Sequence, residues 1–422
     1  MGAGESKASD ELVTFTRRMW RPTTEWWLYV AFVLNQRMPN NKGFVEELLI
    51  ILEEMVFQWY DFDTQQMVSQ RSDDGFELDL HKFPCDMKAP NVAIQCVTKM
   101  FSCTTLFKLN LSDTRITDIG IAALAESLPS SRIEFLYLSK CGVTDSGVAA
   151  LTKSLPESPH LTTLDLNQNS ITDAGAISLA NCLHIFDPVR QLCRRRSRLR
   201  HIRLRGNYIT DVGATRLAKT VPDSNMENIS LSWNKITDDG AMKIMHFLKQ
   251  RWSKSGPRIP TPRLERLYLR WNNITDVGVA FIAERLSNSN LLDLNLNYTY
   301  TGDRGAKALA KCLPFCQLQI LGLRGNYITD DGAKALKKSL RRSQLLKLNL
   351  LHNNVSVDCP YFLGYVLNRN QKQINVLVQP TSYNPFCSVS MQMAELDPEK
   401  DGVYETRYKL HYNKYTNDRI II

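Results

Sequence analysis

Apolar residues recur along most of the chain at short spacings, and a fixed set of polar residues follows them. Between Leu318 and Leu340 three leucines have the spacing L-x-x-L-x-L, which predicts a short strand with one buried side. Asn326 follows where a side-chain amide can bond the backbone as the strand ends. Thr329-Asp330 then offers oxygens to the free N–H groups of a helix. The pattern predicts one strand and one helix, whose apolar surfaces the unit cannot bury alone.

The same unit recurs along the chain. Its strand pattern begins at Leu106, Ile133, Leu161, Leu199, Met226, Leu264, Leu291, Leu318 and Leu345. The last three of these units start 27 residues apart (345 − 318 and 318 − 291). Eight units carry an aspartate followed two positions later by a glycine. We expect each glycine to keep its helix slim. A leucine pattern with a period of about 20–29 residues is typical of leucine-rich repeats.

The consensus L-x-x-L-x-L-x-x-N-x-I-T-D-x-G-A resembles that of the ribonuclease-inhibitor-like subfamily of leucine-rich-repeat proteins, roughly over residues 106–357. The resemblance implies an α/β fold, a leucine-rich-repeat solenoid in the form of a right-handed β-α horseshoe. We expect a degenerate first repeat at 76–105 and regular repeats at 106–379, closed by a strand around Ile374 and Val376. The subfamily includes inhibitors, GTPase activators, immune sensors and cytoskeletal or ciliary scaffolds.

The two ends of the chain depart from the repeat. Residues 1–10 form a polar, flexible N-terminus whose M-G-x-x-x-[ST] start matches the N-myristoylation pattern at Gly2. Residues 11–75 predict a helical, aromatic N-terminal cap that shields the first repeat, with a docking module for a partner as the alternative. Residues 380–422 form a C-terminal extension in which alternating apolar residues predict a β-hairpin.

The composition of the chain indicates in which cellular compartment we expect it. The chain has 422 residues, a net charge of +9 and ten cysteines, which show no C-x-x-C pair and no histidine partner at zinc-ligand spacing. We expect the cysteines to be reduced and buried, which favours the cytoplasm, with the cytoskeleton or cilium implied by the resemblance. Neither a secretory signal nor an apolar stretch of about 20 residues is present, so we expect no secretion and no transmembrane segment.

The concave face is the first candidate binding surface, because residues that alternate with the buried leucines point outwards there. In the middle repeats these residues are rich in arginine and aromatic types, which are enriched in binding hot spots. The candidate partner-binding residues are His201, Arg203, Arg205, Trp233, Arg266, Tyr268, Arg270, Trp271, Tyr298 and Arg324.

Two insertions, near 184–198 and 249–263, lengthen the repeat after a helix and before the next strand. They should leave the solenoid on one edge and form a basic rim. Its residues are Arg190, Arg194, Arg195, Arg196, Arg198, Lys249, Arg251, Lys254, Arg258 and Arg263. Such charge attracts partners that carry negative charge. The expected partners are one or more proteins with acidic surfaces. An anionic membrane surface is an alternative, and nucleic acid is the less favoured one.

No pattern of catalytic residues, phosphate-binding loop or metal-ligand spacing is present, so we predict no catalytic residue, no metal and no cofactor, and expect no small-molecule substrate. The prediction is a non-enzymatic protein–protein interaction scaffold, a structural or adaptor subunit of a larger assembly. Two alternatives stay open. One is a Ran-type GTPase-activating protein, which the resemblance allows, and the other is a myristoylated peripheral membrane adaptor that combines Gly2 with the basic rim.

Overall fold

The computed structural model describes residues 76–79, 98, 106–183, 197–248, 263–356, 370, 374–377, 411–412 and 419–420. The chain divides into two compact units, Met1–Thr381 and Ser382–Ile422, and each is described by itself. Gly2 and the helical cap expected at 11–75 lie outside the described residues. None of the helices within the described ranges is long and apolar enough to cross a membrane.

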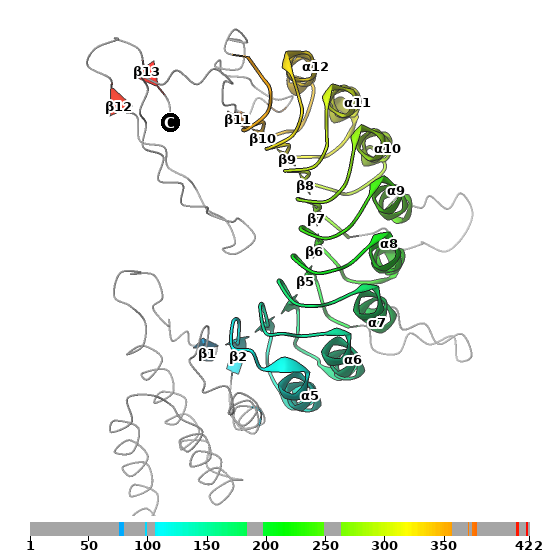
Figure 1. Cartoon of the computed structure of the whole chain (residues 1–422), viewed down its shortest axis with the longest axis vertical. Helices are drawn as coiled ribbons and strands as arrows, with labels where there is room; N and C mark the ends of the chain where they lie inside the picture. The colour runs from blue at the N-terminus through cyan, green and yellow to red at the C-terminus, as the bar shows by residue number, and fades with distance from the viewer. Residues whose placement is uncertain are drawn as a thin grey trace, which may run out of the picture. The chain divides into compact units, whose positions relative to one another are not determined.

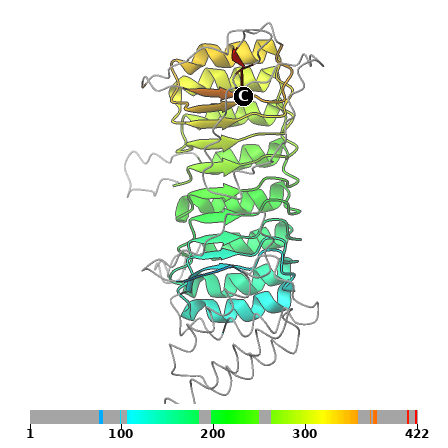
Figure 2. The same ribbon diagram turned by 90° about the vertical axis from the view of Figure 1, so that its left-hand side faces the viewer.

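The first unit contains one parallel sheet in which the described strands follow one another in chain order (Figure 2). Its strands are β1 (Phe76–Asp79), β2 (Leu106–Asn110), β3 (Phe135–Tyr137), β4 (Thr163–Asp165), β5 (His201–Arg203), β6 (Asn228–Ser230), β7 (Arg266–Tyr268), β8 (Asp293–Asn295), β9 (Ile320–Gly322), β10 (Lys347–Asn349) and β11 (Asn375–Leu377). β1 lies at the start of the expected first repeat and pairs with β2, and β11 lies where the closing strand was expected and pairs with β10.

Helices form the second layer. They are α5 (Thr117–Ser127), α6 (Asp145–Ser154), α7 (Asp173–Leu183), α8 (Asp211–Thr220), α9 (Asp238–Phe247), α10 (Asp276–Leu286), α11 (Asp303–Cys312) and α12 (Asp330–Leu340). The array curves so that the strands line its inner side and the helices its outer side (Figure 1). The predicted α/β leucine-rich-repeat horseshoe is confirmed.

The core lies between the two layers and is continuous through the array. Leu321 and Leu323 from the strand region and Leu336 and Leu340 from the helix are all 0% exposed in the unit read first from sequence. Four of the described helices are followed by a short 3-10 turn that has proline at its second position. The proline stops the helix, and the chain then returns toward the sheet. These turns are η1 (Leu128–Ser130), η2 (Leu155–Glu157), η3 (Val221–Asp223) and η4 (Leu313–Phe315).

A ladder of buried asparagines ties neighbouring repeats together. The Asn326 amide group donates to the carbonyl of Leu323 in its own repeat and to that of Leu296 in the preceding repeat. Its oxygen accepts from the backbone N–H of Thr301, also in the preceding repeat. The prediction that this asparagine bonds the backbone is confirmed, and the bonds also cross between repeats.

The repeated aspartates play a different part from the one expected. In most repeats the threonine caps its own helix, as Thr329 does by accepting from Asp331 N–H. The carboxylate of Asp303 instead accepts from the next repeat, from Thr329 N–H at 2.8 Å, the Thr329 hydroxyl at 2.6 Å and Gly332 N–H at 3.0 Å. The same bond to a glycine N–H of the next repeat is made by Asp145, Asp173, Asp238 and Asp276, so these aspartates cap the following helix and link two repeats.

This link also explains the glycine two positions later. A Cβ atom built on Gly332 would stand 2.5 Å from an Asp303 carboxylate oxygen, closer than such atoms approach. The same crowding recurs at Gly175, Gly213 and Gly278, where the preceding repeat's carboxylate lies 2.4–2.6 Å from an added Cβ. The glycine leaves room for the carboxylate to reach the helix N–H, rather than only keeping the helix slim.

The second unit is described only by two short strands. β12 (His411–Tyr412) pairs antiparallel with β13 (Arg419–Ile420). This pair lies in the C-terminal extension, where Tyr412 is opposite Arg419. The hairpin predicted for the extension stays a prediction. Residues 380–410 lie outside the described part of the chain.

Candidate functional site

The inner face of the sheet brings the predicted binding residues of β5 to β8 into rows. His201 is in register with Asn228 on β6, which in turn is in register with Arg266 on β7. Arg203 is aligned in the same way with Ser230 and then with Tyr268. Because neighbouring strands lie about 4.8 Å apart, residues in one row are within side-chain reach of each other.

An aromatic ladder, Trp233, Trp271 and Tyr298, follows β6, β7 and β8 in three consecutive repeats. The indoles lie 5.0 Å apart at 46°, and Tyr298 stacks on Trp271 at 4.6 Å with only 6° between the ring planes. All three residues have a φ of 52–56°, in the left-handed region. That conformation costs roughly 1–2 kcal/mol for a residue with a Cβ, so ring packing here offsets backbone strain.

Glycines occupy the same position in the repeats on both sides of the ladder. Gly206 precedes Trp233, and Gly325 follows Tyr298, with φ values of +69° and +67°. A Cβ atom on Gly325 would stand 2.3 Å from the Tyr298 ring, so the ring lies directly over this glycine. The glycine leaves the space that the ring fills at this end of the ladder.

Arginines pack against the rings of the ladder. The Arg205 guanidinium lies 5.5 Å from the Trp233 ring centre, and those of Arg270 and Arg324 lie 5.0 and 5.5 Å from the Tyr298 centre. Since the Trp271 indole has a neighbouring ring on either side, the stack turns its ring faces inwards.

Positive charge dominates this part of the face. Arg203 makes an ion pair with Asp165 at 3.4 Å, the longest of the ion pairs in this region. Burial, together with the charges of Arg266 and Arg203, lowers the pKa of His201 below its usual value, although Glu227 opposes this. Burial raises the pKa of Asp165 despite the nearby arginines. The face is therefore partly desolvated and carries excess positive charge.

Asp293 is the acidic group at the centre of the face. Burial raises its pKa to about 6, while a hydrogen bond from the Tyr268 hydroxyl at 3.0 Å and the charges of Arg266 and Lys347 act in the opposite direction. Its ordinary pKa is 3.8, so between pH 3.8 and 6 the folded chain holds a proton that the unfolded chain has lost. Stability therefore decreases as pH rises through this window.

We expect Asp293→Asn to stabilise the chain at neutral pH. The amide removes a charge that is costly to bury, and the free energy of unfolding should rise by about 2 kcal/mol at pH 7.5. Below about pH 3 the Asp293 carboxyl is protonated in both the folded and the unfolded state, so the gain should vanish. Urea unfolding of both chains at the two pH values measures this, and a gain of equal size at both would contradict it.

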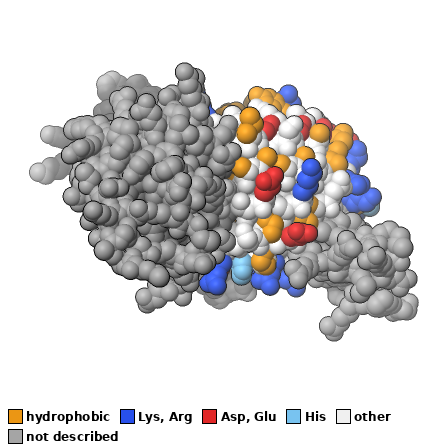
Figure 3. All heavy atoms as spheres, turned by 90° about the horizontal axis from the view of Figure 1, so that it is seen from below, with side chains coloured by type: hydrophobic (Ala, Val, Ile, Leu, Met, Phe, Trp, Pro, Cys, Tyr) orange, Lys and Arg blue, Asp and Glu red, His pale blue; other side chains and the backbone are white. Residues whose placement is uncertain are grey.

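The basic rim is described only at its borders. Arg198 and Arg263 are exposed residues just before β5 and β7, which agrees with insertions that join a helix to the next strand. The other eight rim residues lie outside the described residues. On the part of the surface visible in Figure 3, acidic, basic and apolar side chains are interspersed.

Two features of the surface were not predicted from sequence. Ser230 is 1% exposed, and its hydroxyl has no hydrogen-bond partner; the same holds for the side-chain oxygen of Asn228. A second aromatic column, Tyr300 stacked on Tyr327 at 6.1 Å, lies two positions beyond the ladder in each repeat. The recurrence of tyrosine after the asparagine position was the sequence signal for the second column, whereas no sequence signal marked Ser230 or Asn228.

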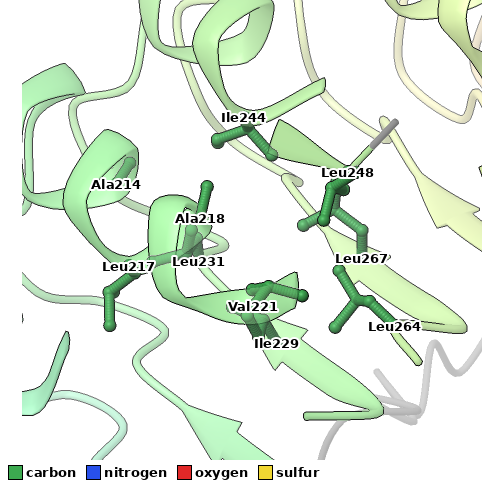
Figure 4. A pocket seen from close by; sticks show the side chains of 10 residues that line it. All are labelled: Ala214, Leu217, Ala218, Val221, Ile229, Leu231, Ile244, Leu248, Leu264 and Leu267. Atoms are coloured by element: carbon green, nitrogen blue, oxygen red, sulfur yellow. The ribbon is translucent and has the colours of Figure 1, made fainter. Parts of the chain in front are cut away.

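A small pocket lies inside the array, between α8, α9, β6 and β7 (Figure 4). Aliphatic side chains line it, including Leu217, Ile244 and Leu267. With no polar side chain among its lining residues, it offers little to orient a ligand. We assign it to the core beside the second insertion.

The chain is similar to known leucine-rich-repeat proteins. The leucine-rich-repeat family matches residues 102–125, 133–151, 157–180, 223–245, 263–283 and 316–337. No curated protein matches the chain at a significant level. Similar solved structures include internalin inlF of Listeria monocytogenes, with 18% identity, 73% of this chain and 72% of that chain covered, and a TM-score of 0.41. Internalin C2 of the same organism has 21% identity, 61% and 84% coverage, and a TM-score of 0.36. The receptor kinase HAESA ectodomain of Arabidopsis has 13% identity, 71% and 46% coverage, and a TM-score of 0.36.

Proposed function

We propose that this chain, which contains leucine-rich repeats, is a non-enzymatic scaffold that binds a protein partner with an acidic surface on its concave face. Leucine-rich-repeat proteins are generally interaction scaffolds. The observation that supports this face is the aromatic ladder: Trp233 and Trp271 keep 45% and 42% of their surface exposed while held in a strained backbone conformation. Exposed, rigid indoles beside arginines are the residue types that dominate binding hot spots.

The partner's chemistry follows from the charges around the ladder. Arg203 and Arg266 lie on β5 and β7, the two strands that flank β6, and Arg205 and Arg270 follow these strands in the chain. Asp165 makes an ion pair with Arg203. An acidic surface would complement this charge and accelerate association. The resemblance to ribonuclease-inhibitor-like proteins adds the proposed setting, a structural or adaptor subunit of a cytoskeletal or ciliary assembly in the cytoplasm.

We expect Trp271→Ala to weaken partner binding by roughly 30-fold or more, because the central ring of the ladder supports both neighbours. Affinity purification with the native chain identifies the partner, and calorimetry with the purified pair measures the dissociation constant. Tyr327→Ala is the matched control, since Tyr327 is 57% exposed but belongs to the second aromatic column. Unchanged affinity of the folded Trp271→Ala chain would reject the concave face as the binding surface.

A further inference from the structure

We propose that the outer surface of α11 and α12 binds the anionic lipid surface of a membrane. This inference goes beyond the proposed function, because the helices line the outer side of the array and the concave face lies on its inner side (Figure 1). We call this surface the α11–α12 patch. Its residues are Lys307, Lys311, Lys334, Lys338, Arg341 and Arg342, with Phe315 beside them.

The patch consists of side chains that two neighbouring helices expose to solvent. Lys307 and Lys311 are exposed on one face of α11, and Lys334 and Lys338 have the same places on α12. Each residue of α12 follows its counterpart by one repeat of 27 residues (334 − 307 and 338 − 311), and the two helices are in contact. Lys307 makes an ion pair with Asp331 of α12 at 3.5 Å, so the exposed rows are neighbours. The four ammonium groups therefore share one continuous surface.

An exposed aromatic ring lies at the C-terminal ends of the two helices. Phe315 belongs to η4, which contacts both α11 and α12. It is 75% exposed, the highest value among the exposed large apolar residues of the described chain. Leu313 and Cys316, before and after it, are 0% and 3% exposed, so the core anchors the backbone that carries the ring. In the next repeat the same position is taken by Arg342, which is also exposed (342 − 315 is 27). The ring is thus held in solvent beside basic side chains.

The acidic residues of these helices leave most of the positive charge uncompensated. Asp303 and Asp330 are the first residues of α11 and α12, and their carboxylates accept hydrogen bonds from the next repeat. Asp331 pairs with Lys307. Within the described residues, the other five basic side chains of the patch make no ion pair. The patch therefore presents its charge to solvent.

The repeat itself does not explain this charge. Where α11 and α12 have Lys311 and Lys338, α10 has Glu284. The helix dipole favours basic residues in the last turn of a helix, which accounts for Lys311 and Lys338. It does not account for Lys307 and Lys334, which lie in the middle of their helices, or for an exposed ring next to them. A partner with negative charge and an apolar layer explains all of these features.

An anionic bilayer fits the patch better than an acidic protein or a nucleic acid. Four of the six basic residues are lysines, which act as hydrated point charges, whereas arginine predominates where phosphates are recognised in a fixed geometry. A bilayer surface offers many mobile negative headgroups, and clusters of about four to eight basic residues on a helix are typical of anionic-lipid binding. Below its headgroups it also offers an apolar layer that an aromatic ring such as Phe315 can enter.

Sedimentation with vesicles tests the proposal on the full chain, produced without myristate at Gly2. The chain should bind vesicles of equal parts phosphatidylserine and phosphatidylcholine, and it should not bind vesicles of phosphatidylcholine alone. A basic residue near an anionic membrane contributes about fivefold in affinity, so the double variant Lys311→Gln/Lys338→Gln should bind about 25-fold more weakly. Equal binding of the native chain to both kinds of vesicle, or full affinity of the double variant, would overturn the proposal.

The chain offers a matched control for the two lysines. Lys153→Gln/Lys219→Gln removes the same charge from the same helix position, on α6 and α8, where the residues are also exposed. These lysines are several repeats from the patch, so their loss should weaken binding less than about twofold at physiological salt. The melting temperature of each double variant verifies that it folds. Equal losses of affinity in the two double variants would mean that only net charge matters, and would overturn the proposal.

Salt separates the contribution of the ring from that of the charges. Phe315→Ser should weaken vesicle binding about tenfold at low and at high salt, because it removes the apolar contact. The effect of the lysine double variant should decrease as salt rises, since salt screens charges at a surface. Tyr208→Ser is the control, because Tyr208 is 52% exposed but lies before α8. Full affinity of Phe315→Ser at both salt concentrations would overturn the proposal.

Other anionic ligands distinguish a membrane from other partners. A poly-glutamate peptide or a double-stranded oligonucleotide should bind more weakly than the anionic vesicles at equal concentration of charge. Tighter binding of either one, lost in Lys311→Gln/Lys338→Gln, would assign the patch to an acidic protein or to nucleic acid and overturn the proposal. The proposed function is tested separately, because the effect of Trp271→Ala on the protein partner is measured without lipid.

Discussion

Asn272→Ala should lower the free energy of unfolding by about 3–4 kcal/mol, the largest effect we expect from one substitution. Asn272 is 2% exposed, and its oxygen accepts from Ile236 N–H at 3.0 Å. Its NH₂ group donates to the carbonyls of Leu231 and Leu269, at 2.9 and 3.0 Å. Alanine makes none of these bonds and leaves buried backbone groups unpaired in two repeats, each at a cost of roughly 1–3 kcal/mol.

The neighbouring residue provides the control for this experiment. Asn273 is exposed, and the hydrogen bond given for it comes from its backbone N–H, to Ile236. Asn273→Ala should therefore change the free energy of unfolding by less than about 0.5 kcal/mol. Urea unfolding followed by circular dichroism compares the two variants. Equal stability of the two variants would show that the hydrogen bonds of the buried asparagines contribute little to the stability of the fold.

Gly278→Ala should destabilise the chain by about 2–3 kcal/mol, although alanine is normally the better helix former. An added Cβ would stand 2.4 Å from the Asp238 carboxylate, which accepts from Gly278 N–H at 3.0 Å and Thr275 N–H at 2.7 Å. The carboxylate must move, so the helix loses the cap supplied by the preceding repeat. The unfolding midpoint in urea measures this loss.

A double-mutant cycle tests the cause. Asp238→Ala alone removes the same cap, so combining it with Gly278→Ala should cost clearly less than the sum of the two single changes. Additive effects would mean that the methyl group clashes elsewhere, for instance with Ile274, whose side chain lies 3.0 Å from the added Cβ. The cycle therefore distinguishes loss of the inter-repeat cap from crowding inside the helix.

The candidate site was predicted in part. Trp233 and Trp271 stood out in the sequence because they replace small or polar residues, and the structure brings them together with Tyr298 in one stack. The sequence pattern did not show that the Ser230 hydroxyl and the Asn228 side-chain oxygen are buried without a hydrogen-bond partner, because small residues on a strand carry no signal of their own. Their burial can be understood only when β5 and β7 are aligned with β6.

The repeated leucines, asparagines and D-x-G pairs determined the fold from sequence alone. A period of this length lets each unit bury its apolar surfaces only against copies of itself, so the array follows from local pattern. The partners of the polar residues were decided by the tertiary structure. Asp303 is the first residue of its own helix but caps the next one, because stacking places that helix start beside its carboxylate. Stacking likewise converts isolated tryptophans and arginines into a continuous surface, since contacts between repeats are set by register and curvature.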